Sequence, residues 1–180
     1  MPTLSRARPI PIMGMEKKND GTKTLVVFYS KTGNTRLVAK AIARSLNADI
    51  EEIKDKKSRD GILGFLRSGY EAIFEKLSYI APINENPAEY DLVIIGSPVW
   101  ASRLSSPVRT YMSLHGNKIK KAAFFATCGM RSGKIFKQMR ELIGSNSPIA
   151  TLEVRKGEVV SGDYLKKIED LKKKLSLKIE

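Results

Sequence analysis

Residues 30–35, Ser-Lys-Thr-Gly-Asn-Thr, form a short polar segment whose residue types suit the binding of an anion such as a phosphate group. The segment follows the strongly apolar run 24–30 and precedes apolar residues at helical spacing over 37–46. The first N–H groups of a helix have no intrahelical partner and can bind an anion there. The hydroxyl side chains add donors, and Gly33 allows the backbone to approach the anion closely.

Two better-known phosphate motifs do not describe this segment. It lacks the G-x-x-x-x-G-K-[ST] spacing of nucleoside triphosphatases and the G-x-G-x-x-G spacing of dinucleotide-binding proteins. An ordinary helix start made of serine and threonine is the simplest alternative. The position of the segment, after the first buried strand of an alternating chain, favours an anion site.

Two further segments follow the predicted strands over 91–97 and 122–127. Residues 96–102, Gly-Ser-Pro-Val-Trp-Ala-Ser, hold the only tryptophan of the chain, Trp100. An indole can stack on a planar ring, with about 0.5–1.5 kcal/mol beyond area burial, although core packing of Trp100 is the plain alternative. Residues 127–133, Thr-Cys-Gly-Met-Arg-Ser-Gly, offer backbone N–H groups.

These segments are connected by an alternation of strand and helix patterns. Apolar, β-rich runs predict strands over 24–30, 48–54, 91–97, 122–127 and 150–155. Helical spacing predicts helices over 37–46, 60–78, from 106, over 132–143 and from 164. Such alternation implies one doubly wound α/β domain, with a five-stranded parallel sheet and helices on both faces.

The sequence Tyr-Ser-Lys-Thr-Gly-Asn-Thr over 29–35 resembles the flavodoxin signature [ST]-x-T-G-x-T, and 96–101 resembles the G-[ST]-P-x-[WY]-x segment of that family. The resemblance runs from about 24 to 175. It implies the flavodoxin-like strand order 2-1-3-4-5, with flavin mononucleotide (FMN) at the switch point between strands one and three. The residues that it implies for FMN binding are Ser30, Lys31, Thr32, Gly33, Asn34, Thr35, Pro98, Val99, Trp100, Ala101, Thr127, Cys128 and Gly129. Among them, Lys31 is expected to matter less than Thr32 and Thr35. The aromatic side chain that many flavodoxins place after the fourth strand is missing from 127–133, which suggests an open flavin face.

Length and composition fit a single domain over 23–180, preceded by a mobile tail over 1–22 that does not read as a secretory signal. The sequence has no run of about 18 apolar residues, so no membrane-spanning helix is expected. One cysteine excludes an intramolecular disulfide and a cysteine-based metal site. A cytoplasmic location is therefore expected. The net charge of +13 is spread along the chain, which argues against nucleic acid and favours a solvated lysine-rich surface or an acidic redox partner.

Two residues invite other chemistry. Cys128 begins the segment Cys-Gly-Met-Arg-Ser-Gly-Lys, which is partly similar to the phosphate loop of tyrosine phosphatases. That loop needs an arginine where this chain has Lys134, and lysine does not replace its two-pronged contact. A buried thiol without a catalytic role is the favoured interpretation. His115, the sole histidine, has no candidate partners for a metal site or a catalytic triad, and a structural role is expected.

The sequence leaves the function open among three hypotheses, and no residue stands out as catalytic. The first is a redox flavoprotein that carries electrons through FMN to a partner protein, with an acidic surface matching this basic chain. The second is an FMN-dependent NAD(P)H:quinone-type reductase with a small-molecule acceptor. The third is a non-redox module that binds another phosphorylated ligand. The many aromatic residues over 60–80 add the hypothesis of a homodimer.

Overall fold

The computed structural model describes residues 21–56, 61–143 and 147–179 of the chain. Most of the predicted tail, residues 1–20, therefore lies outside the described residues. Within the described ranges, no helix is long and apolar enough to cross a membrane.

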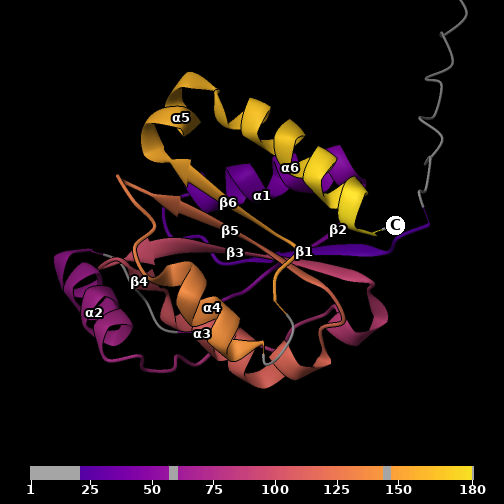
Figure 1. Ribbon diagram of the computed structural model, residues 1–180. Coiled ribbons are helices and arrows are strands. Elements are labelled where there is room, and N and C mark those ends of the chain that lie inside the picture. The colour runs from indigo at the N-terminus through magenta and orange to yellow at the C-terminus, as the bar shows by residue number, and fades with distance from the viewer. Residues whose placement is uncertain (1–20, 57–60, 144–146, 180) are drawn as a thin grey trace, which may run out of the picture.

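Five parallel strands form the centre of the molecule, in the order β2-β1-β3-β5-β6 (Figure 1). Their bounds are β1 Thr24–Phe28, β2 Asp49–Glu52, β3 Leu92–Trp100, β5 Ala122–Cys128 and β6 Ala150–Arg155. Counted along the chain, this order is 2-1-3-4-5, which confirms the predicted fold. All five residues of β1 and all seven of β5 are buried, as expected for strands covered on both faces.

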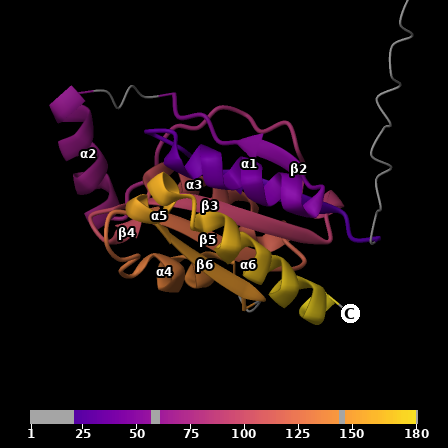
Figure 2. The same ribbon diagram turned by 90° about the horizontal axis from the view of Figure 1, so that it is seen from above.

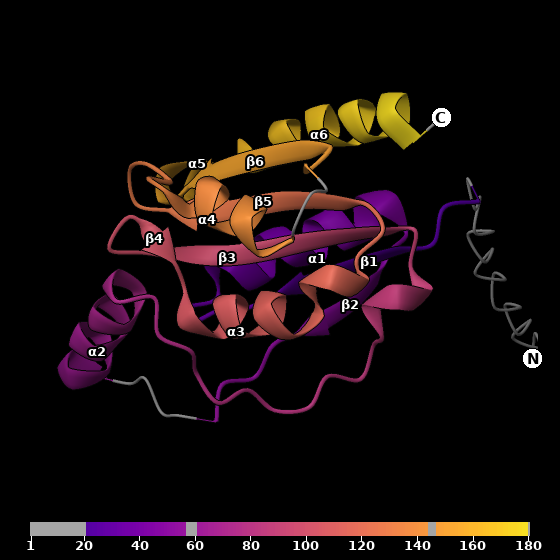
Figure 3. The same ribbon diagram turned by 60° about the horizontal axis from the view of Figure 1, so that its bottom comes forward.

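Helices cover both faces of this sheet (Figure 3). One face carries α1 Asn34–Leu46, α5 Lys156–Ser161 and α6 Tyr164–Ile179, and the other carries α3 Ser106–His115 and α4 Ile135–Leu142. Two short 3₁₀ helices, η1 Pro87–Glu89 and η2 Gly116–Lys118, lie in connections. Each face has its own apolar core, with Val26 and Ile42 in one and Val27 and Tyr111 in the other.

Helix α2, Gly61–Ile73, lies apart from these two layers. In all three ribbon views it stands beyond the carboxyl ends of the parallel strands rather than flat against the sheet. It is shorter than the predicted helix over 60–78, since Glu75 has φ +53° and turns the chain out of the helix. A helix in this position can form a wall of a site at the strand ends.

Two elements differ from the sequence predictions. Strand β3 runs three residues beyond Ser97 to Trp100 and folds back antiparallel into the two-residue strand β4, Arg103–Leu104. Helix α5 follows β6 directly, where no helix was predicted. Both elements lie at the carboxyl ends of the strands, where flavodoxin-like sheets bind ligands.

Candidate functional site

The segment between β1 and α1 has the geometry of an anion-binding helix start. Gly33 is the N-cap of α1, with φ +97° and no side chain to cap the helix. The Ser30 hydroxyl accepts the Gly33 N–H at 3.1 Å, and the Gly33 carbonyl accepts the Leu37 N–H at 2.9 Å. The first N–H groups of α1, which a helix leaves without intrahelical partners, therefore belong to residues at the rim of a cavity.

That cavity lies at the carboxyl ends of the strands and has a volume of about 550 Å³. Clefts that bind cofactors commonly measure about 300–1,000 Å³ and are mostly apolar. Of the thirteen residues implied by the resemblance, eleven line it: Lys31, Thr32, Asn34, Thr35, Pro98, Val99, Trp100, Ala101, Thr127, Cys128 and Gly129. The other two, Ser30 and Gly33, do not line the cavity and are joined to each other by the hydrogen bond described above. The structure thus brings the three predicted loops to one cavity of a size that suits FMN, while their contact with a flavin stays a prediction.

A buried hydrogen bond joins the segment over 30–35, here called the anion segment, to the end of β5. The hydroxyl oxygens of Thr35 and Thr127 lie 2.7 Å apart, although the two residues are 92 positions apart in the sequence. Thr127 pairs with Pro98 in the sheet, so the ends of β3 and β5 are held in register beside α1. This bond fixes the helix start relative to the rest of the cavity.

Trp100 stands at the tip of the β3–β4 hairpin. Its indole packs edge-on against Tyr29, with ring centroids 5.6 Å apart and planes at 87°. The two turn residues, Ala101 and Ser102, have φ of +47° and +60°, the backbone of a type I′ hairpin turn that usually takes asparagine or glycine. Trp100 both contacts the core and lines the cavity, while its stacking on a planar ring stays a prediction.

The loop after β5 is tied to the back of this hairpin. The Lys134 N–H donates to the Ser102 carbonyl at 2.8 Å. Gly133, with φ +61°, approaches Ser102 so closely that an added Cβ would overlap its carbonyl oxygen. The β3–β4 hairpin and the loop after β5, which both line the cavity, are therefore in direct backbone contact.

Helix α2 forms one side of the cavity, here called the α2 wall, which was not predicted from the sequence. Leu66, Gly69, Tyr70 and Ile73 line the cavity, with Ser68 beside them. The helix buries small and polar residues, including Glu71, against the rest of the protein. Its apolar residues Leu66 and Tyr70 remain 61% and 49% exposed. The many aromatics over 60–80 were the only signal in the sequence, and they did not reveal which side would face the cavity.

Helix α2 is held in place by its carboxyl end. Glu75 forms ion pairs with Arg103 at 3.5 Å and with the buried Arg109 at 3.4 Å, and it accepts a hydrogen bond from Gln138 at 2.6 Å. The buried Glu71 accepts from Ser106 at 3.2 Å. The exposed apolar face is therefore presented by an anchored helix.

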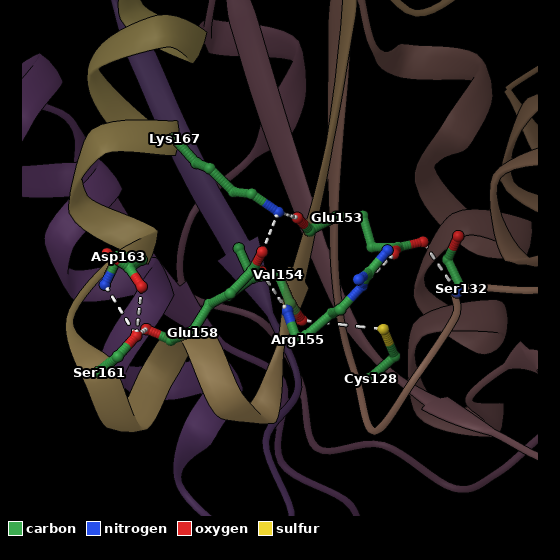
Figure 4. Close-up of polar contacts among 9 residues, drawn as sticks. All are labelled: Cys128, Ser132, Glu153, Val154, Arg155, Glu158, Ser161, Asp163 and Lys167. Carbon is green, nitrogen blue, oxygen red and sulfur yellow. Dashed lines mark hydrogen bonds and ion pairs between the residues drawn. The ribbon is translucent and has the colours of Figure 1, made fainter.

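Cys128 lines the cavity but is a poor nucleophile. Its side chain is buried, and its Sγ lies 3.9 Å from the Val154 carbonyl oxygen (Figure 4). Burial, together with Glu153, raises the pKa of the thiol to about 11. The thiol therefore stays protonated near neutral pH, which opposes phosphatase-type chemistry.

Helix α5 supplies the last part of the lining, Lys156 and Val159. Sequence reasoning missed both, because the segment after β6 carries no apolar repeat long enough to predict a helix. His115 does not line the cavity; burial lowers its pKa, and its ring packs on Tyr111 with centroids 5.1 Å apart. Within the described residues, no group of three or more His, Cys, Asp or Glu could hold a metal ion.

Solved structures of other proteins share the fold of this chain. A flavoprotein from Lactobacillus acidophilus, solved in complex with FMN, superposes with a TM-score of 0.66 at 24% identity, over 78% of this chain and 97% of that one. Reduced flavodoxin from Megasphaera elsdenii gives a TM-score of 0.52 at 20% identity, over 81% and 94%. These likenesses concern the fold.

A sequence relative and a family model add to the structural likeness. An NAD(P)H dehydrogenase (quinone) of Archaeoglobus fulgidus is 31% identical over 98 residues, 52% of this chain and 51% of that protein. The chain thus spans about half the length of this curated relative. The family model described as Flavodoxin matches residues 23–173, nearly all of the described chain. The chain therefore belongs to the flavodoxin family.

Proposed function

We propose that this chain binds FMN in the cavity at the carboxyl ends of its strands and passes electrons through it. The observation that carries the proposal is that the anion segment, Trp100 and the end of β5 line a single cavity of about 550 Å³. The relative solved with FMN has the same fold. Bound FMN would supply the electron chemistry.

The residues present have separate tasks in this proposal. Thr32 and Thr35 donate hydroxyl hydrogen bonds to the phosphate beside the first N–H groups of α1. Trp100 covers one side of the ring, and Gly129 allows its backbone to approach the ring edge. The apolar lining excludes water from the ring, which strengthens every electrostatic interaction in the cavity.

The direct test is reconstitution of the purified protein with FMN. We expect a yellow protein that retains one FMN per chain after gel filtration, whereas riboflavin, which lacks the phosphate, is held more weakly. The test variant is Thr35→Val, which removes the hydroxyl group together with its bond to Thr127 and should hold FMN more weakly than the wild type. A colourless protein that cannot be reconstituted would reject the proposal and leave the non-redox module.

The electron acceptor in the carrier form of this proposal is a protein with an acidic surface. The chain carries 32 Lys and Arg against 19 Asp and Glu, a net charge of +13. Opposite charges speed the encounter of two proteins, and salt screens the effect. Electron transfer to an acidic carrier should therefore slow with rising ionic strength. A rate independent of salt would contradict an acidic partner.

A second candidate, reduction of a small apolar acceptor such as a quinone, is favoured by the α2 wall. Leu66, Tyr70 and Ile73 present apolar surface to the cavity on an anchored helix. A relative that matches half of this chain is named an NAD(P)H dehydrogenase (quinone). In this form of the proposal, the acceptor lies between α2 and the bound ring.

Steady-state oxidation of NADH or NADPH with a soluble quinone separates the two forms. If the reductase form holds, Tyr70→Ser raises the KM for the quinone and leaves FMN affinity nearly unchanged. Tyr79→Ser is the matched control, because Tyr79 is 71% exposed and does not line the cavity. No turnover with either nicotinamide would favour the carrier.

A further inference from the structure

Lys156 brings a positive charge to the cavity from an element outside the flavodoxin motif. It is the first residue of α5 and lines the cavity with Thr32 and Thr35. Helix α5 packs against α1, and Figures 1 and 2 agree that it lies beside the amino-terminal end of α1. Lys156 therefore lines the same cavity as the segment that the proposed function assigns to the phosphate.

The carboxylates nearest to Lys156 in sequence are engaged by other groups (Figure 4). Glu153 accepts the Ser132 N–H at 2.9 Å and pairs with Arg155 at 3.3 Å. Glu158 accepts the Arg155 N–H at 2.7 Å and pairs with Lys167 at 2.6 Å. Both acids have lowered pKa values, Glu153 mainly through hydrogen bonding from Ser132 and Glu158 mainly through the Arg155 N–H.

Lys156 has no carboxylate partner of its own within the described part of the chain. Glu158, the acidic residue in the first turn of α5, is engaged by the Arg155 N–H and by Lys167. An anion in the cavity would therefore be a counter-ion for the Lys156 ammonium group.

We propose that Lys156 supplies a countercharge to the phosphate group of FMN, opposite the N–H and hydroxyl donors of the anion segment. The inference rests on the proposed function. A phosphate monoester carries about 1.5–2 negative charges at neutral pH, more than N–H and hydroxyl donors neutralise. Lys156 thus makes the site select the phosphorylated flavin over the unphosphorylated one.

The test compares FMN with riboflavin as ligands of the whole chain. Dissociation constants are measured at low ionic strength for the wild type, Lys156→Gln, Lys156→Arg and Lys166→Gln. Lys166 is the matched control because it is an exposed lysine on α6 that does not line the cavity. Circular dichroism and thermal melts verify that each variant is folded.

We expect Lys156→Gln to weaken FMN binding about fivefold, as for a partly exposed charge-assisted contact, and to leave riboflavin binding unchanged. Lys156→Arg should retain most of the affinity, Lys166→Gln should match the wild type, and added salt should reduce the effect. Equal weakening of both flavins would overturn the inference, because Lys156 would then only shape the cavity. Unchanged FMN affinity with a shifted midpoint potential would also overturn it, because the charge would then face the ring. Failure of the wild type to bind FMN would instead reject the proposed function itself.

Discussion

The Gly133→Ala substitution tests the coupling between the two loops that form the flavin side of the cavity. Gly133 has φ +61°, and its Cα faces Ser102 of the β3–β4 turn. A Cβ at this position would overlap the Ser102 carbonyl oxygen and lie 2.6 Å from its Cβ. The same carbonyl accepts the Lys134 N–H, so the substitution strains the backbone and disturbs this hydrogen bond.

The magnitude follows from these two penalties. A left-handed backbone costs a non-glycine residue about 1–2 kcal/mol, and forcing an extra carbon into a packed contact costs about 1–3 kcal/mol. We therefore expect a loss of roughly 3 kcal/mol in the free energy of unfolding. In a chain of this size 1 kcal/mol shifts Tm by about 2–4 °C, which gives a fall of roughly 9 °C.

Thermal unfolding followed by circular dichroism measures this fall. The matched control is Gly157→Ala, since an added Cβ there meets no atom within 4 Å and Gly157 lies in α5 without a positive φ. Its Tm should be unchanged or slightly higher, because alanine is the better helix former. FMN affinity should fall in Gly133→Ala, because the hairpin that carries Trp100 shifts. An equal Tm for both variants would refute the coupling.

Three further predictions concern single side chains. Since burial raises the pKa of Cys128 to about 11, a soluble disulfide reagent at mildly alkaline pH should modify it far more slowly in the folded protein than in urea; equal rates would contradict this. Hydrogen bonding from Ser132 lowers the pKa of Glu153, so its stabilisation is present above the unfolded-state pKa and disappears as pH falls through the folded-state pKa. Glu153→Gln should therefore lower the free energy of unfolding in urea titrations near neutral pH but not in strong acid, and an equal loss in acid would argue against this origin. Thr35→Val should weaken FMN binding about tenfold by losing a buried hydroxyl group and its bond to Thr127, more than Lys31→Gln does in the same titration; the reverse order would contradict the ranking of these two residues.

The anion segment could be predicted because its chemistry is local. Gly33 is needed where the backbone is left-handed, and the apolar residues of β1 and α1 flank the segment closely in sequence. The order of the parallel strands follows from the alternation of strands and helices with right-handed crossovers. These features depend on residue types and on short spacing.

The rest of the cavity depends on contacts between distant residues. The hairpin after Trp100 was missed because Ala101 and Ser102 take a left-handed backbone without being glycine. The direction in which α2 presents Tyr70 depends on ion pairs that Glu75 forms with distant segments. The local sequence does not indicate these partners, so the part of the cavity lined by α2, like the part lined by α5, was found only in the structure.

The most direct measurement of the central proposal is titration of flavin-free protein with FMN while the emission of Trp100 is recorded. Trp100 is the only tryptophan of the chain and lines the cavity, so all tryptophan emission originates at that cavity. Bound FMN should quench the emission, with saturation at one FMN per chain. Emission that stays constant up to a large excess of FMN would contradict binding in this cavity.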